Sequence, residues 1–479
     1  MNKIETELKD CYIIEPDKFG DDRGYFSPYF IDKNLEKLGF QKVAQANRSK
    51  SSKGVVRGLH FQQNPKCQSK LVEVINGSAL DVVVDIREDS PTYGKFTIVK
   101  LTKDNNRQLF VPRGFAHGFV ALEDDTVFQY LVDNDYAPKM EGGILWNDPS
   151  IGIPWEGIFL EYGIDQPNLS SKDMVHPLLK DSTVPFKENQ KYLITGYKGQ
   201  LGYDVKRELL SRGVSEENIL AIDKEEMDIT NEEEVMKVVT DFAPDVVFHC
   251  AAWTAVDKAE TELKSCYQVN VTGCKNLAKA SKEVGARIIY LSSDYVFDGK
   301  KALDDLYEVD DQTNPMSMYG LTKYLGEEEI KRNPKHYIVR TSWVFGVNGN
   351  NFIKTMLKLS DTRNELNVVD DQIGSPTYTV DLARLLVDMS QTNKFGTYHA
   401  NNEGFVSWAD FAEYIFKINN RDVKVNHVST EEYIKKMGIK QAYRPRNSKL
   451  SKASLDEAGF DRLPTWESAT DRYVKELIR

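Results

Sequence analysis

Three glycines spaced three residues apart follow a short apolar run, and this feature constrains the fold of the chain more than any other. The stretch Lys191–Gly202 reads Lys-Tyr-Leu-Ile-Thr-Gly-Tyr-Lys-Gly-Gln-Leu-Gly, with glycines at Gly196, Gly199 and Gly202, and a helical pattern follows. The order strand, tight turn, helix N-terminus is typical of a dinucleotide-binding turn. Glycine lets the backbone approach a pyrophosphate, and free helix N–H groups favour its charge. A glycine-rich turn without a ligand is the alternative that the pattern leaves open.

The position of this turn predicts a second domain before it. Such a turn normally opens a doubly wound α/β domain, yet here 190 residues precede it. A chain of 479 residues is long enough for more than one globular domain. Residues 180–190 are polar, contain a proline and lack periodicity, as a linker does. We therefore expect one domain over 1–183, a linker over 184–190 and a second domain over 191–479.

Composition excludes several classes of protein. The net charge of −11 and a pI of about 5.4 argue against a protein that coats nucleic acid. The first ten residues contain no apolar signal segment, and no apolar run approaches the roughly 20 residues that span a membrane. The five cysteines are odd in number and show no metal-binding spacing. We expect a cytoplasmic protein with reduced thiols, no metal, and neither nucleic acid nor membrane as a partner.

The first part of the chain has the pattern of an all-β domain. Segments 79–87, 95–101 and 126–132 are rich in β-branched and aromatic residues, and glycines and prolines separate them at short intervals. A short helix is expected near residues 34–38. Many short strands over about 180 residues predict a cupin-like jelly-roll barrel or sandwich.

Two histidines lie within apolar strands of this part. His60 lies in Val55–Gln62 and His117 in Phe110–Phe119. Each could be a hydrogen-bonded core histidine, a site residue or a metal ligand. Because no His-x-His pair occurs and His176 is the only further histidine in this part, we rank the metal reading below the other two.

Eight stretches of this part, taken in order, resemble the dTDP-4-dehydrorhamnose 3,5-epimerase family over nearly its full length. They are Phe19–Phe26, Gln45–Asn47, Gly54–Gln62, Lys70–Val72, Ser90–Gly94, Pro112–Phe119, Trp146–Pro149 and Leu169–Asp173. The resemblance implies inversion of C3 and C5 of a 4-keto sugar. Both carbons carry acidic protons beside the carbonyl, and their inversion needs a base, an acid on the opposite face and a cation for the enolate.

The resemblance also assigns roles to individual residues. His60 would be the base, oriented by Asp173, while Tyr130 would return the proton and Lys70 would stabilise the enolate. The expected substrate contacts are the diphosphate clamp Arg23 and Arg57, and the sugar-site residues Gln45, Asn47 and His117. The chain departs from the family at Pro28, where a Glu is usual, and at Ser69, where a Gly is usual. The first departure affects the expected nucleotide contacts, and the number of inverted centres stays open.

The second part alternates between strands and helices, which predicts a parallel sheet with helices on both faces, that is, a Rossmann-type doubly wound fold. Ile219–Asp223 reads as the second strand and ends in a carboxylate. Asp223 follows the glycine turn by about 20–25 residues, where an acid commonly bonds the adenosine ribose and favours NADH. Lys224 could instead pair with a 2′-phosphate, so NADPH stays open as the cofactor.

A tyrosine and a lysine four residues apart follow the strand Arg287–Ser293. Tyr319 and Lys323 would share one face of a helix, where the lysine charge would lower the pKa of the phenol. Ser293 at the strand end would donate a hydrogen bond to the substrate oxygen. The cofactor would then deliver hydride to a carbonyl carbon, and Tyr319 would supply the proton to the carbonyl oxygen.

This part resembles the dTDP-4-dehydrorhamnose reductases, which are extended short-chain dehydrogenases. The matching stretches are Thr195–Gly202, Met227–Thr230, Ala251–Glu260, Ser292–Gly299, Arg340–Trp343, Asp371–Thr377 and Arg444–Leu450. They imply a small substrate-binding lobe carrying Trp343, Gln372, Pro376 and Arg446. The expected cofactor contacts are Gly196, Gly199, Gln200, Leu201, Gly202, Asp223, Asp228, Ala251, Ala252, Thr254, Tyr319 and Lys323. Family members usually have Thr where Ser293 stands and Asn where Cys250 stands.

Together the two parts predict a bifunctional enzyme. The first would epimerise a dTDP-4-keto-6-deoxyhexose, and the second would reduce its ketone with NADPH or NADH to dTDP-L-rhamnose. Inversion of a single centre, or a regulatory nucleotide-binding subunit without turnover, are the alternatives. The epimerase resemblance further implies a homodimer.

Overall fold

The computed structural model describes residues 1–40, 42–182, 186–187 and 189–477, and it divides into two compact units. The first unit includes Met1–Asn189, and the second includes Gln190–Ser390 and Lys394–Arg479. The expected domain end at residue 183, and residues 184, 185 and 188 of the expected linker, lie outside the described residues. No described helix is both long and apolar enough to cross a lipid bilayer.

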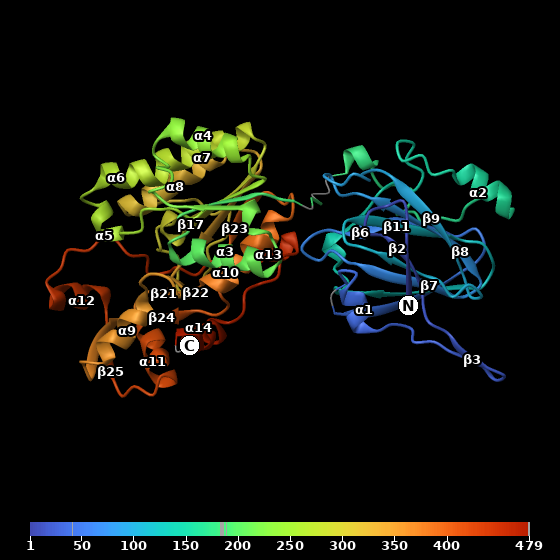
Figure 1. Cartoon of the computed structure of the whole chain (residues 1–479). Helices are drawn as coiled ribbons and strands as arrows, with labels where there is room; N and C mark the ends of the chain where they lie inside the picture. The colour runs from blue at the N-terminus through green and yellow to red at the C-terminus, as the bar shows by residue number, and fades with distance from the viewer. Residues whose placement is uncertain (41, 183–185, 188, 478–479) are drawn as a thin grey trace. The chain divides into compact units, whose positions relative to one another are not determined.

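The first unit is built on two antiparallel sheets, which confirms its β-rich prediction (Figure 1). One sheet has the order β1-β2-β10-β7-β12-β5 and the other β13-β6-β11-β8-β9. Their bounds are β1 Asn2–Glu5, β2 Tyr12–Glu15, β5 Gln45–Ser51, β6 Val56–Gln62, β7 Lys70–Asn76, β8 Ser78–Asp85, β9 Phe96–Thr102, β10 Gln108–Val111, β11 Phe115–Ala121, β12 Thr126–Val132 and β13 Glu141–Gly143. The three strands expected from the sequence therefore lie within a residue or two of β8, β9 and β12.

Strand β8 is buried along its whole length because both faces of its sheet are covered. Ala79 and Val83 belong to a core with residues of both sheets, such as Val72 and Phe128, so this face points toward the other sheet. Leu80, Val82 and Val84 belong to a core with Trp155 and Ile158 of α2 (Trp155–Tyr162). Since successive side chains of a strand point to opposite faces, this parity fixes which residues face the space between the sheets.

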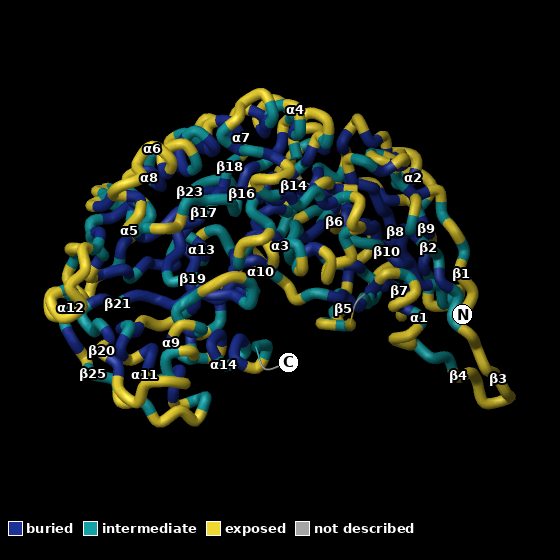
Figure 2. The backbone as a smooth tube through the Cα atoms, turned by 60° about the vertical axis from the view of Figure 1, so that its left-hand side comes forward, coloured by how far each residue is buried: buried dark blue, intermediate teal, exposed yellow. Residues whose placement is uncertain are grey.

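A hairpin of β3 (Phe19–Asp21) and β4 (Gly24–Phe26) extends from the first unit and is exposed at every residue (Figure 2). The helix expected near 34–38 is α1 (Asp32–Glu36). Its Leu35 packs with Phe40, Leu71 and Phe110 on the outer face of the first sheet.

The second unit contains a six-stranded sheet whose pairings are all parallel, which confirms the expected α/β pattern. Its order is β15-β14-β16-β17-β18-β23. The bounds are β14 Tyr192–Thr195, β15 Ile219–Ile222, β16 Val246–His249, β17 Arg287–Ser293, β18 His336–Thr341 and β23 Gly396–His399. The chain moves from β14 to β15 on one side and then to β16 on the other. A crevice forms at such a switch point beyond the carboxyl ends of the strands.

Helices cover both faces of this sheet (Figure 1). Side chains of α4 (Glu232–Phe242), α7 (Gly273–Glu283) and α8 (Met318–Ile330) form a core on one face. On the other face, α3 (Gln200–Ser211) packs beside α10 (Thr379–Ser390). A small lobe has its own aromatic core, built on α9 Phe352–Ser360, β20 Glu365–Val369, α11 Trp408–Ile418, β25 Lys424–Val428 and α14 Trp466–Leu477. Shorter elements are α5 Val256–Ala259, α6 Leu263–Tyr267, β19 Val344–Phe345, β21 Ile373–Gly374, β22 Thr377–Tyr378, β24 Val406–Ser407, α12 Thr430–Met437 and α13 Ala453–Ala458.

A buried ion pair joins α8 to β18. Both guanidinium N–H groups of Arg340 that face Glu327 donate to its carboxylate, at 2.9 and 2.8 Å, and both residues are almost fully buried. We expect Glu327→Ala to lower the free energy of unfolding of the second unit by about 3–5 kcal/mol, because it leaves an unpaired buried charge. Urea unfolding would measure this. Lys237→Ala, which breaks an exposed pair with Asp241, should change it by about 0.5 kcal/mol or less; equal effects would contradict the argument.

Candidate active sites

Several of the predicted polar residues of the first unit face the space between the two sheets. His117 lies on β11 between Phe115 and Phe119, which point into the core shared by both sheets. Lys70 and Tyr130 have the parity of the inward-facing Val72 and Phe128. The register pairs His60 with His117, and a bulge in β6 then pairs Arg57 with Phe119. The bulge therefore turns both Arg57 and His60 inward, although they lie three residues apart.

His60 and Asp173 form the closest polar contact of this group, as the sequence predicts. The Nε2 atom of His60 lies 2.5 Å from Oδ1 of Asp173. Burial raises the pKa of the Asp173 carboxyl, but the hydrogen bond and charge of His60 outweigh it, so the pKa is lowered and the carboxylate stays ionised. Because Nε2 faces Asp173, the Nδ1 atom of His60 is the nitrogen left to accept a proton. The His60 side chain is 31% exposed, so a substrate can reach it.

A second chain of contacts joins Lys70, His117 and Asp81. The Nε2 atom of His117 lies 3.0 Å from Asp81, and its Nδ1 atom lies 3.5 Å from Nζ of Lys70. Burial lowers the pKa of His117 despite the charge of Asp81, so the ring is neutral at neutral pH. The ring then donates to Asp81 and presents a lone pair to the ammonium. Burial also lowers the pKa of Lys70, to about 8.

Tyr130 and the amide side chains lie on neighbouring strands. The register pairs Tyr130 of β12 with Asn47 of β5, and Gln45 donates to Asn47 at 2.6 Å. Burial raises the pKa of Tyr130, while the charge of Arg57 partly opposes the shift, so its phenol is protonated and able to donate. Arg57 itself donates to Ser51 at 3.2 Å.

Arg23 is not brought to this group of residues. It lies on the exposed hairpin, where its guanidinium pairs with Asp21 and its side chain is 90% exposed. Of the two arginines expected to clamp the diphosphate, only Arg57 therefore lies near the other predicted residues.

In the second unit, the glycine turn after β14 touches the turn after β16, and this contact explains the glycine spacing. Gly196 has a φ of +68°, and a Cβ atom there would lie 2.7 Å from the backbone of Ala251. A Cβ atom on Gly202 would lie 2.4 Å from the carbonyl oxygen of Gly196. Glycine is thus required for a tight cradle at the N-terminus of α3, where a pyrophosphate binds well. This geometry fits a dinucleotide.

We expect Gly202→Ala to weaken NAD(P)H binding at least 10-fold, about 1.4 kcal/mol, because the methyl group forces the turn away from α3. Titration of the intrinsic fluorescence with NADPH would measure the loss. Gly157→Ala is the control, since a Cβ atom there meets nothing within 4 Å. Equal affinity in both variants would show that the turn does not hold the cofactor.

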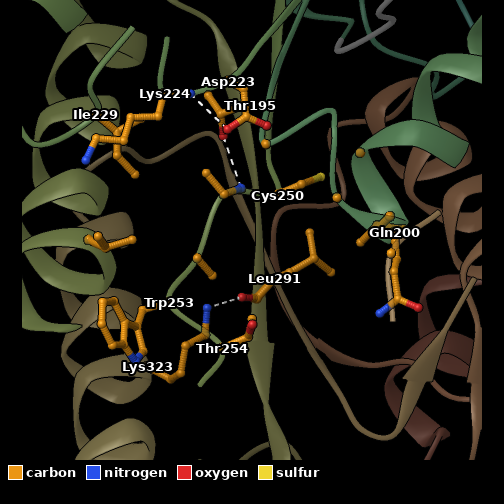
Figure 3. A pocket seen from close by; sticks show the side chains of 18 of the residues that line it. Thr195, Gln200, Asp223, Lys224, Ile229, Cys250, Trp253, Thr254, Leu291 and Lys323 are labelled. Atoms are coloured by element: carbon orange, nitrogen blue, oxygen red, sulfur yellow. Dashed lines mark hydrogen bonds between the residues drawn. The ribbon is translucent and has the colours of Figure 1, made fainter. Parts of the chain in front are cut away.

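A cavity of about 920 Å³ extends from the glycine turn to Lys323 and Tyr319. Figure 3 shows Gln200, Asp223 and Lys323 among the side chains that line it. All twelve residues expected to contact the cofactor line it: Gly196, Gly199, Gln200, Leu201, Gly202, Asp223, Asp228, Ala251, Ala252, Thr254, Tyr319 and Lys323. The cavity is the size of a ligand site.

The acidic residues lie at the β15 end of this cavity. Asp223 accepts hydrogen bonds from the backbone N–H groups of Lys198 and Lys224, so it also holds the glycine turn. Asp228 accepts from the N–H and hydroxyl of Thr230, which lowers the pKa of its carboxyl. Lys224 lines the cavity beside them and offers a cation for a phosphate.

The catalytic residues expected on α8 lie at the other end, but their electrostatics differ from the expectation. Nζ of Lys323 donates to the carbonyl oxygen of Leu291 at 2.6 Å, as the dashed line in Figure 3 marks. Burial raises the pKa of Tyr319, although a hydrogen bond with Ser293 partly opposes the shift. The expected lowering of this pKa is therefore wrong, because burial raises the pKa of Tyr319 and the nearby charge of Asp294 adds to the shift. Burial also lowers the pKa of Lys323, to about 8.

Ser293 bonds its neighbour Asp294. The Ser293 hydroxyl donates to Asp294 at 2.9 Å, and Ser448 donates to the other oxygen of that carboxylate at 2.5 Å. Since a hydroxyl has one proton, Ser293 faces Tyr319 as an acceptor in this state. Donation to a substrate oxygen would require the Ser293 proton to turn away from Asp294.

The expected substrate-side residues lie on the small lobe and the segment that leads to Ser448. Trp343 stacks on Trp408 with ring centroids 3.6 Å apart. Gln372 donates to Thr430 at 3.0 Å. Pro376 follows four residues later, within the same matching stretch, Asp371–Thr377. The backbone of Ile373 donates to Arg446, whose own side chain is exposed. Gln372 and Arg446 are thus linked through Ile373, the residue that follows Gln372.

Sequence reasoning missed four residues at these sites. Asp81 was detectable as a carboxylate in the middle of the apolar strand β8, which ends in a second carboxylate, Asp85. Asp294 was detectable because it directly follows Ser293 in the sequence. His176 was detectable because it lies three residues after Asp173. Glu141 had no sequence signal. Its charge raises the pKa of Lys70 and of Tyr130, and it lies on β13, which pairs with β6.

Comparison with known proteins finds relatives for both parts of the chain. A family model described as dTDP-4-dehydrorhamnose 3,5-epimerase matches residues 5–181, and one described as the RmlD substrate binding domain matches residues 190–479. The chain is 48% identical over 176 residues to the dTDP-4-dehydrorhamnose 3,5-epimerase of Shigella flexneri, covering 36% of this chain and 93% of that protein. It is 39% identical over 297 residues to the dTDP-4-dehydrorhamnose reductase of Sinorhizobium fredii, covering 60% and 97%.

A solved structure extends the second match. The crystal structure of the dTDP-4-dehydrorhamnose reductase of Bacillus anthracis in complex with NADP is 41% identical, with a TM-score of 0.57, and the match covers 60% of this chain and all of that one. The chain therefore belongs to the dTDP-4-dehydrorhamnose 3,5-epimerase family over its first part and to the dTDP-4-dehydrorhamnose reductase family over its second.

Proposed function

We propose that the chain is a bifunctional enzyme of dTDP-L-rhamnose biosynthesis. Its first unit inverts C3 and C5 of dTDP-4-dehydro-6-deoxy-D-glucose, and its second reduces the 4-ketone with NAD(P)H. The observation that carries this proposal is one polypeptide with both a His60–Asp173 pair and a dinucleotide-sized cavity ending at Tyr319 and Lys323. The domain assignment is 1–183 for the epimerase, with a cupin-like jelly roll, and 191–479 for the reductase.

In the epimerase unit, Nδ1 of His60 takes the proton from the carbon beside the carbonyl. Asp173 stabilises the imidazolium through Nε2, which it contacts at 2.5 Å. The negative charge that develops on the ketone oxygen is met by the Lys70 ammonium, held next to His117. Tyr130 returns a proton from the opposite face, for which its raised pKa keeps it protonated. Arg57, Gln45 and Asn47 bind the substrate from β5 and β6.

In the reductase unit, the glycine turn and Asp223, Asp228, Ala251 and Thr254 would hold the cofactor, which supplies hydride to C4 when bound. Tyr319 protonates the ketone oxygen as negative charge develops there. Ser293 binds the same oxygen once its proton turns from Asp294. Lys323 favours the phenolate that Tyr319 becomes, since its ammonium lies on the same helical face. Trp343, Gln372 and Arg446 hold the sugar nucleotide on the small lobe.

A homodimer is part of the proposal for the first unit. The β3–β4 hairpin exposes Phe19, Tyr25 and Phe26 at 61%, 60% and 68%. Three large exposed aromatic rings on one short hairpin are unusual for an isolated surface. Together with Arg23, they suit insertion into a second copy of this chain.

Isotope labelling tests the function directly. The protein is incubated with dTDP-4-keto-6-deoxyglucose in D₂O without NAD(P)H, and we expect deuterium at both C3 and C5. Addition of NADPH should then consume one equivalent and yield dTDP-L-rhamnose. Label at one carbon only would exclude double epimerisation, and labelled ketone that is never reduced would exclude the second activity.

The lowered pKa of Lys70 gives the epimerase a pH dependence. Lys70 is protonated below its pKa of about 8 and loses its charge as the pH rises through that value. We therefore expect deuterium exchange to fall above about pH 8. Lys70→Arg should keep the charge and remove this fall, because guanidinium stays protonated. An unchanged pH profile in that variant would mean that another group controls the decline.

A further inference from the structure

Three side chains able to bind a metal ion meet at the epimerase base. They are His60, Asp173 and His176, and one nitrogen or oxygen atom from each lies within 4.8 Å of the others. Oδ1 of Asp173 is 2.5 Å from Nε2 of His60 and 3.9 Å from Nε2 of His176. The two imidazole rings meet nearly edge to face, with centroids 5.7 Å apart.

The backbone of β13 leaves room for the second histidine. Gly143 pairs with His60 in the register, and a Cβ atom on Gly143 would lie 2.5 Å from the His176 ring. His176 therefore fills the space that this glycine leaves open. Its side chain is only 11% exposed, and its Nε2 atom has no hydrogen-bond partner among the described residues. A buried polar nitrogen without a partner is costly, and it is available as a ligand.

We propose that this cluster binds a zinc-type divalent cation, and that the cation inhibits epimerisation. Two imidazole nitrogens and one carboxylate oxygen are a ligand set that zinc accepts, with a fourth position left open. Ligand atoms about 2.0 Å from a tetrahedral ion lie roughly 3.3 Å apart. The present separations of 2.5 and 3.9 Å fall on either side of this value, so small side-chain movements complete the site.

Inhibition follows from the tautomer of His60 and rests on its proposed role as the base. A neutral imidazole carries one proton. When the cation takes the lone pair of Nε2, that proton resides on Nδ1, the nitrogen that would otherwise accept a proton from the sugar. The cation also occupies the Asp173 oxygen that stabilises the imidazolium. The bound enzyme therefore has no base at this position, while the second unit keeps its activity.

The test uses zinc and cobalt ions with the full-length protein. Zinc affinity is measured by competition with a chromophoric chelator, and Co²⁺ should give the visible absorption of a tetrahedral site. We expect His176→Ala to weaken binding by at least roughly 10- to 100-fold, since it removes a ligand. The matched control is His427→Ala, which alters an exposed cluster with Asp410 and Glu413. It should leave the tetrahedral spectrum and the inhibition unchanged.

Deuterium exchange with and without zinc completes the test. For each variant, the exchange rate with zinc is divided by the rate of the same variant without zinc. A loss of basal exchange therefore does not affect the comparison. Wild type and His427→Ala should be inhibited, and His176→Ala should resist the same zinc concentration. His176→Asn, a smaller change in volume, serves if the alanine variant fails to fold, as judged by the circular dichroism of the full-length protein. Unchanged zinc affinity in the His176 variants, or bound zinc without inhibition, would overturn the proposal. The cobalt spectrum remains informative even if no exchange occurs.

Discussion

His60→Ala is expected to lower deuterium exchange into the 4-keto sugar by about 10²- to 10⁴-fold, the contribution typical of a general base. The substitution removes the ring that contacts Asp173 at 2.5 Å and so takes a hydrogen-bond partner from that carboxylate. Water can still enter the vacated space, so a slow residual exchange is expected. The measurement is the rate of deuterium incorporation at C3 and C5 by NMR.

The second unit provides the control within the same molecule. In His60→Ala, reduction of independently prepared dTDP-4-dehydrorhamnose by NADPH should continue at the wild-type rate. Asp173→Asn should also slow exchange, because it keeps the shape but loses the charge that stabilises the imidazolium. Full exchange in His60→Ala would assign the base to another group, and loss of reduction as well would indicate misfolding.

The sequence was most informative where a pattern is local. The glycines of the turn, Tyr319 and Lys323 each lie within a dozen residues of the partner that defines them, so spacing alone predicts a shared turn or helical face. The alternation of strands and helices likewise predicted the parallel sheet. In the first unit, apolar strands with inward polar residues were recognisable for His60 and His117.

What the sequence could not provide depends on long-range pairing. His60 meets Asp173 across 113 residues, and although the family resemblance implies this pair, residue spacing cannot give it, because Asp173 lies in a turn outside the sheets. The bulge turns Arg57 and His60 to the same face of the sheet, and the alternation of apolar and polar residues along the strand does not predict it. The pKa of Tyr319 depends on how completely α8 and β17 exclude water, which residue spacing does not report. Arg23 lies on an exposed hairpin, and residue spacing does not report that it lies apart from the other predicted residues.

Tyr319→Phe is expected to reduce NADPH oxidation by about 10²- to 10⁴-fold or more, because it removes the proton donor for the ketone oxygen. The change deletes one oxygen and keeps the ring, which packs edge to face against Tyr295 with centroids 5.3 Å apart. Lys323 still donates to Leu291, and the glycine turn is untouched. Cofactor affinity, measured by fluorescence titration, should therefore change by no more than a few-fold.

Tyr295→Phe is the matched control, since it removes a hydroxyl from the neighbouring ring. That hydroxyl contacts Arg444 at 3.4 Å rather than Ser293, so its loss should leave the rate of NADPH oxidation largely unchanged. The comparison of the two variants thus separates loss of the proton donor from loss of a neighbouring phenol hydroxyl. Because burial already raises the pKa of Tyr319, the phenol is protonated before the ketone arrives. Formation of the phenolate then costs free energy in the transition state, and in the proposed mechanism the Lys323 ammonium lowers this cost.

Lys323→Met should therefore lower the rate even with Tyr319 in place. Turnover that survives in Tyr319→Phe would instead place the proton donor elsewhere in the cavity.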